Sequence, residues 1–96
     1  MIRKIRINED IDNYEYVYIY HSLGGEVVFD KVEDAKEYAI NELNELMTVA
    51  RADKKAVLQL IDNINNSFNS NGFYGDGHSK QYSCYKVKHF IWFFKQ

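Results

Sequence analysis

The spacing of apolar residues changes twice along this chain of 96 residues. Residues 14–21 alternate, with tyrosines on one side, which is the period of a strand. Residues 33–68 repeat about every 3.6 positions, which is the period of a helix packed on one face. Residues 82–94 alternate again. A chain that passes from strands to helices and back to a strand predicts an α+β fold.

Three strands are expected before the helices. Residues 2–7 alternate basic and apolar side chains, residues 14–21 form the clearest strand, and residues 27–29 return after a turn at residues 23–26. That turn contains Gly24 and Gly25, which tolerate the positive φ of tight hairpins. The sequence therefore predicts an antiparallel meander of three strands, followed later by a fourth strand at residues 82–94.

Two helices are expected between these strands. Asp30 and Glu33 have the spacing of a capping box for the first helix, and Asp53 can cap the second. One helix over residues 33–68 would be long beside the usual length of about 10–14 residues. The predicted order is βββααβ, a four-stranded antiparallel sheet with two helices packed on one face. Six side chains are expected in the core: Leu43, Leu46, Ile61, Ile64, Val87 and Ile91.

Length and composition predict one domain over residues 1–96. An apolar share of 46% is well above that of disordered chains, so the chain should fold without a partner. The single Cys84 cannot form an intramolecular disulfide, and the first residues do not resemble a secretion signal, so a cytoplasmic location is expected. The apolar run at residues 90–94 is far shorter than a membrane-spanning helix.

No catalytic, cofactor or metal site is expected. Cys84 and His89 have opposite parity on the predicted strand and so point to opposite faces, which disfavours both a zinc site and a nucleophile pair. The glycines of residues 72–77 match neither a phosphate-binding loop nor a dinucleotide fingerprint. The sequence therefore favours a non-enzymatic binding protein without a cofactor or bound metal.

The polar, glycine-rich segment 67–81 is expected to be a long loop. It contains two neighbouring aromatic residues, Phe73 and Tyr74, which have no place in a periodic apolar stripe. Large aromatic side chains are favoured anchors in protein interfaces, so both are candidate partner-binding residues. The alternative is that they fold back onto the domain.

Charge is distributed unevenly. Residues 9–45 contain eleven acidic residues and only two lysines, a balance of −9, whereas the whole chain carries −2. Five of these acids fall on the first predicted helix and are candidate partner-binding residues: Glu33, Asp34, Glu37, Glu42 and Glu45. Such a face is either simply solvated or presents carboxylates to the cationic groove of a partner.

The tyrosine strand allows a second interpretation. Exposed rings on a sheet can stack on the bases of single-stranded nucleic acid, but they can also form a core and its rim. This interpretation would gain support if five basic residues lined up on one sheet face, which adjacent first and last strands would allow: Arg3, Lys4, Arg6, Lys86 and Lys88. The acidic loops around the hairpin oppose binding to phosphates, so direct nucleic-acid binding is the alternative rather than the main prediction.

In its small size, its asparagine- and isoleucine-rich composition, its acidic surface and its lack of catalytic motifs, the chain resembles the small inhibitors made by bacteriophages and mobile elements, including anti-CRISPR proteins. The resemblance extends over the whole chain and concerns size, composition and charge, so it assigns no individual residue. It implies a protein that binds a host defence nuclease or its complex and blocks nucleic-acid access or a conformational step.

Overall fold

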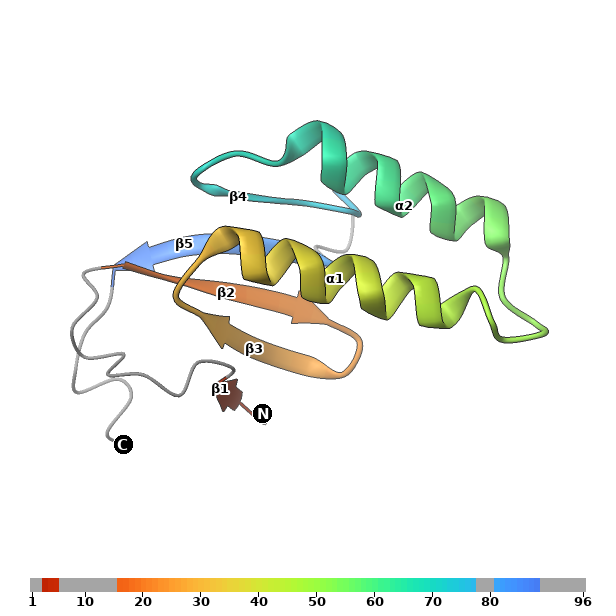
Figure 1. Ribbon diagram of the computed structural model, residues 1–96, viewed down its shortest axis with the longest axis horizontal. Coiled ribbons are helices and arrows are strands. Elements are labelled where there is room, and N and C mark those ends of the chain that lie inside the picture. Colours follow the sequence, from red (N-terminus) through yellow and green to blue (C-terminus); the bar gives the residue numbers. More distant parts are fainter. Residues whose placement is uncertain (1–2, 6–15, 78–80, 89–96) are drawn as a thin grey trace.

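A computed structural model describes residues 3–5, 16–77 and 81–88. One five-stranded sheet, with strand order β1-β3-β2-β5-β4, carries two helices on one face (Figure 1). The elements in chain order are β1 (Arg3–Ile5), β2 (Tyr16–Ser22), β3 (Gly25–Phe29), α1 (Val32–Leu46), α2 (Lys54–Ser67), β4 (Gly72–Phe73) and β5 (Ser83–Lys88). The predicted α+β class and the helices packed on one face are confirmed.

Four of the strands, β3, β2, β5 and β4, form an antiparallel sheet. The predicted meander is wrong for β1, which pairs with β3 and runs parallel to it. The reason lies in β2, whose two edges are already occupied by its hairpin partner β3 and by β5. Within the β2–β3 hairpin, the outer edge of β3 is the edge left for β1 to pair with. A continuous basic sheet face would have required β1 to lie beside β5. Strands β3 and β2 separate them, so this requirement is not met.

The hairpin between β2 and β3 has the predicted turn. Ser22 pairs with Gly25, and Leu23 and Gly24 form the tip. Gly25 has a φ of 118°, which lies in the region that favours glycine. The turn leaves the Leu23 side chain at the end of the hairpin, where 76% of its surface is exposed.

Two separate helices are confirmed, but their starts differ. The Asp53 carboxylate accepts a hydrogen bond from the Ala56 backbone N–H at 3.2 Å, so it caps α2 as predicted. The capping box at Asp30 is wrong, because α1 begins at Val32 after an extended Lys31 and has no side-chain cap. Phe29, next to Asp30, is still paired with Tyr18 in the sheet, and the chain turns into the helix only afterwards.

The segment expected to be a long loop contains the short strand β4. A turn bridges Asn69 and Gly72, and β4 then pairs with β5 through Gly72–Tyr85 and Phe73–Cys84. Gly72 has a φ of 134°, and a Cβ there would overlap the Cys84 carbonyl oxygen. Glycine is therefore required for the close approach of these two strands.

The main core lies between the sheet and the helices. Leu43 and Ile64 are fully buried in it, as predicted, whereas Leu46 and Ile61 are only partly buried and pack against its edge. Val87 is partly buried against a second cluster on the opposite sheet face, formed by Val17, Ile19 and Val28. The sixth expected core residue, Ile91, lies outside the described residues.

The tyrosines of β2 lie in the core, at its edge and on the surface. Tyr20 is completely buried and meets Tyr38 edge to face, with ring centroids 5.7 Å apart. The Tyr18 hydroxyl donates to the Ser70 carbonyl at 2.9 Å, and Tyr16 is the exposed member. Tyr14 lies outside the described part of the chain. Tyr18 and Tyr20 are thus engaged within the domain and do not offer an open stacking platform.

Candidate protein-binding cleft at the end of helix α1

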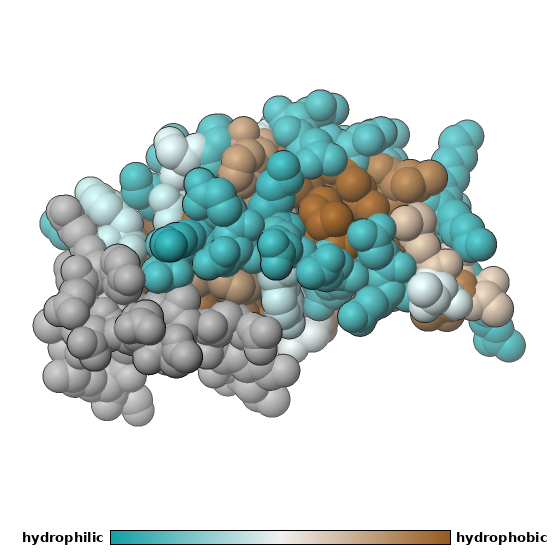
Figure 2. Space-filling view, viewed as in Figure 1, coloured by the Kyte–Doolittle hydropathy of each residue, from teal (hydrophilic) through white to brown (hydrophobic). Residues whose placement is uncertain are grey.

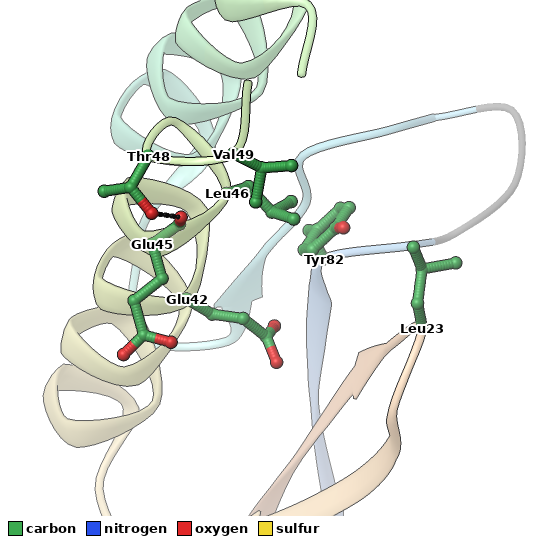
Figure 3. Close-up of a pocket in the computed structure, with 7 residues that line it drawn as sticks. All are labelled: Leu23, Glu42, Glu45, Leu46, Thr48, Val49 and Tyr82. Atoms are coloured by element: carbon green, nitrogen blue, oxygen red, sulfur yellow. Dashed lines mark hydrogen bonds between the residues drawn. The ribbon is translucent and has the colours of Figure 1, made fainter. Parts of the chain in front are cut away.

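A cleft of about 460 Å³ lies where the carboxyl end of α1 meets the β2–β3 hairpin and the chain entering β5 (Figure 3). We call it the α1-end cleft. Its lining residues are Leu23, Glu42, Glu45, Leu46, Thr48, Val49 and Tyr82. They come from three segments that are far apart in the sequence, and only the folded chain brings them together.

The walls of the α1-end cleft are mainly apolar. Leu23 projects from the hairpin tip, and Val49, which is 50% exposed, follows the end of α1. Leu46, in the last turn of α1, is half-buried beside them. Two exposed aliphatic side chains on one cleft are a feature of surfaces that bind partners, because water is released when they are covered.

Tyr82 closes the cleft on the side of the sheet. It is a non-glycine residue with positive φ, 57°, directly before β5, and its side chain is buried. Burial first, and then the negative charge of Glu42, raise the pKa of the Tyr82 hydroxyl. The hydroxyl therefore stays protonated at neutral pH and adds no charge to the cleft.

Glu42 is the carboxylate that enters the cleft. Figure 3 shows its side chain extending from α1 toward Tyr82 and Leu23. Its Oε1 atom accepts a hydrogen bond from the buried Tyr20 hydroxyl at 2.8 Å. Burial, strengthened by this hydrogen bond, raises the pKa of Tyr20, so the tyrosine remains a donor. Within the described chain no basic side chain forms an ion pair with Glu42.

The rim and the helix end add further negative potential. Glu45 is exposed, and in Figure 3 its carboxylate points away from Tyr82. The last turn of α1 contains no basic residue. Since the carboxyl end of a helix carries a partial negative charge, this end of α1 attracts cations. The α1-end cleft therefore combines apolar walls with an inward carboxylate and a negative electrostatic potential.

The five predicted acids do not form one surface. Glu33 and Glu37 line a different groove of about 370 Å³ beside Lys36, Ile40, Asn41 and Asn65, between α1 and α2. Glu33 and Glu45 are about 18 Å apart along the helix axis. Asp34 is exposed near the start of α1. Figure 2 shows polar surface surrounding apolar surface over the two helices. The expected single acidic face is thus divided between two grooves.

The aromatic pair is also divided. Phe73 is buried and contacts the rings of Tyr20 and Phe68, with centroids 6.1 and 6.4 Å away, so it serves the core and is not an exposed anchor. Tyr74 is 57% exposed, while its backbone N–H donates to Ser67 Oγ at 2.9 Å. Phe73 is the last residue of β4 and lies in the core, whereas Tyr74 follows the strand. Only Tyr74 remains available to a partner.

Most of the cleft residues were not predicted as site residues. Leu46 was assigned to the core. No sequence motif marked the other four as site residues: Leu23, Thr48, Val49 and Tyr82. The available signal was weak: Leu23 is a lone aliphatic residue in a turn beside glycines, where a solvent-exposed polar residue is usual. Such isolated exposed leucines are common on protein surfaces, so the signal alone could not identify the cleft.

Cys84 and His21 lie outside the α1-end cleft. Cys84 is buried, and burial raises the pKa of its thiol to about 12. His21 Nδ1 lies 3.3 Å from Glu26 Oε2, and its ring meets Tyr85 edge to face. No group of three potential metal ligands occurs among residues 3–5, 16–77 and 81–88. In the same ranges no helix has the length and apolarity needed to cross a bilayer.

No protein-family model, curated protein or solved structure matches the chain.

Proposed function

We propose that this chain is a non-enzymatic protein-binding domain that docks through the α1-end cleft. The observation that carries the proposal is the combination, in one cleft, of exposed aliphatic side chains and an inward carboxylate without a basic partner within the described chain. Covering Leu23 and Val49 would supply apolar burial, and the carboxylates would select the partner by charge.

The more specific form of the proposal is inhibition of a protein that handles nucleic acid, such as a host defence nuclease. Exposed carboxylates on α1, including Asp34 and Glu45, would meet the cationic surface that normally binds phosphates. A bound domain of this size would then block nucleic-acid access or hold the nuclease in one conformation. Small size, composition and acidic charge support this form of the proposal.

The direct test compares capture by the parent with capture by a cleft variant. Leu23→Ser combined with Val49→Ser removes two exposed aliphatic side chains without touching the core. We expect the parent, and not the double variant, to retain a nuclease or its complex from a bacterial lysate and to inhibit its cleavage in purified form. Leu58→Ser is the control, since Leu58 is about as exposed as Val49 but lies on α2. Equal capture and inhibition by all three proteins would contradict docking through the cleft.

A second candidate function is direct binding of single-stranded nucleic acid. It is favoured by one observation: Lys86 Nζ lies 4.7 Å from the centroid of the exposed Tyr16 ring, and Lys88 pairs with Tyr16 across the strands. A ring flanked by two lysines can stack on a base while the lysines contact phosphates. Lys86→Glu with Lys88→Glu should then abolish salt-sensitive binding of an oligothymidine, and unchanged binding would exclude this patch.

A further inference from the structure

Glu42 is a half-buried carboxylate whose only hydrogen-bond donor within the described chain is a neutral hydroxyl. A carboxylate withdrawn from water is stabilised best by a cation, and here no side chain of the described residues supplies one. We infer that the α1-end cleft receives a lysine side chain of the partner, flanked by aliphatic residues. This inference rests on the proposed function and specifies the chemistry of its ligand.

The cleft matches both parts of a lysine side chain. Its lining of Leu23, Leu46 and Val49 can cover the four methylene groups of the stem. The ammonium group can then reach Glu42 at the inner end and the negative end of α1. A volume of about 460 Å³ also leaves room for a neighbouring aliphatic side chain, which would bury Leu23 and Val49 further.

The hydrogen bond from Tyr20 favours lysine over arginine. Glu42 Oε1 already accepts the Tyr20 hydroxyl, so a guanidinium group that contacts both carboxylate oxygens would compete with this bond. An ammonium group is a compact charge and needs only the second oxygen. Tyr20 therefore acts as a positioning residue, which holds the carboxylate toward the cleft and leaves one oxygen for the ligand.

Defined peptides test this inference without an identified partner. Four capped pentapeptides, acetyl-Ala-Leu-X-Leu-Ala-amide with lysine, arginine, acetyl-lysine or glutamate at X, are titrated into isotope-labelled protein. Dissociation constants come from the backbone amide shifts of Leu23, Leu46 and Val49. We expect the lysine peptide to bind about fivefold or more tightly than the acetyl-lysine peptide, and the glutamate peptide to bind weakest. The advantage of lysine should decrease as salt is added.

Three variants locate the charge. Glu42→Gln keeps the shape and an acceptor for Tyr20, so it should remove the difference between lysine and acetyl-lysine. The protein should still fold, with a smaller loss of stability than Tyr20→Phe, because a neutral acceptor replaces the charged one. Glu37→Gln makes the same change in the other groove and should leave the difference intact. Tyr20→Phe frees both oxygens of Glu42, and the arginine peptide should then bind as well as the lysine peptide.

The outcomes separate this inference from the proposed function. If acetyl-lysine binds as tightly as lysine, or if Glu42→Gln keeps the difference, the cleft does not select lysine, and the inference is wrong. If Leu23→Ser with Val49→Ser still abolishes capture of the nuclease in that case, docking through the cleft remains supported. Conversely, charge-dependent lysine binding together with equal capture of the nuclease by the double variant would support the ligand chemistry and show that the nuclease docks on another surface.

Discussion

At the scale of single residues, the hydrogen bond between Tyr20 and Glu42 connects the core with the cleft. Tyr20→Phe removes the hydroxyl and keeps the ring in its contacts with Tyr38 and Phe73. Because the acceptor is charged, we expect the free energy of unfolding to fall by about 1.5–3 kcal/mol at neutral pH. Urea unfolding of the parent and the variant measures this difference. An unchanged midpoint would show that water replaces the hydroxyl without loss.

The same bond predicts a pH dependence. Burial and the hydrogen bond raise the pKa of Tyr20 above its ordinary value of about 10. Above pH 10 the unfolded chain loses the hydroxyl proton while the folded chain retains it. The stability that this group contributes is therefore complete below about pH 10 and is lost as the pH rises further. The alkaline loss of stability should be less steep in Tyr20→Phe, by about 1.4 kcal/mol per pH unit.

Phe73 and Tyr74 are neighbours with opposite roles, and a pair of substitutions separates them. Phe73 is buried among aromatic rings, so Phe73→Ala should cost about 3–5 kcal/mol of unfolding free energy. Tyr74 is mostly exposed, so Tyr74→Ala should change stability by less than about 0.5 kcal/mol. Thermal unfolding distinguishes the two. Equal losses would mean that Tyr74 also packs against the domain.

At the scale of elements, the two helices begin differently although each is preceded by an aspartate. Asp53 caps α2 through the Ala56 N–H, so Asp53→Ala should destabilise the protein by about 1 kcal/mol. Asp30 lies before the uncapped start of α1, and Asp30→Ala should leave the denaturation midpoint almost unchanged. A larger loss at Asp30 than at Asp53 would restore the capping box that the sequence predicted.

Strand β4 depends on one glycine. Gly72→Ala introduces a Cβ that overlaps the backbone of Cys84 at a φ of 134°, so β4 must separate from β5. We expect a severe loss of stability and loss of amide-exchange protection in both strands. Gly77→Ala is the control, since a Cβ there meets no atom within 4 Å. It should be neutral or slightly stabilising, because alanine restricts the unfolded chain.

At the scale of the whole molecule, Cys84 reports on opening of the core. Its thiol is 2% exposed, and burial raises its pKa to about 12, so both the access and the ionisation needed for reaction are suppressed. Labelling by an aromatic disulfide reagent should be slow in the native protein and should accelerate with urea in parallel with global unfolding. Rapid labelling of the native protein would show that β4 and β5 separate without unfolding of the domain.

The folded molecule separates an acidic region from a basic region, although the net charge of the whole chain is only −2. The carboxyl end of α1 carries Glu42 and Glu45 beside the cleft. Lys86 and Lys88 of β5 pair with Tyr18 and Tyr16 of β2. On β2, Tyr20 contacts Glu42 while Tyr16 lies beside these lysines, so the two charged regions are four residues apart along one strand. This arrangement gives the two candidate partners, a cationic protein segment and a nucleic acid, separate surfaces.

The sequence by itself determined the elements whose apolar residues repeat over several turns or several alternations. Residues on the stripes of α1 and α2, such as Leu43 and Ile64, were predicted to be buried and are buried, because helical period alone decides which face packs. The same holds for the alternation of Tyr16, Tyr18 and Tyr20, and for the hairpin turn at Gly24 and Gly25.

Only the tertiary structure decided the features that depend on pairing between distant segments. The place of β1 followed from which strand edges were already occupied, and β4 is too short to show any period. The burial of Phe73 and the division of the acidic residues followed in turn from these pairings and from the packing of α1 on the sheet. The α1-end cleft joins a hairpin tip, a helix end and the start of β5, and no local pattern encodes the distance between such segments.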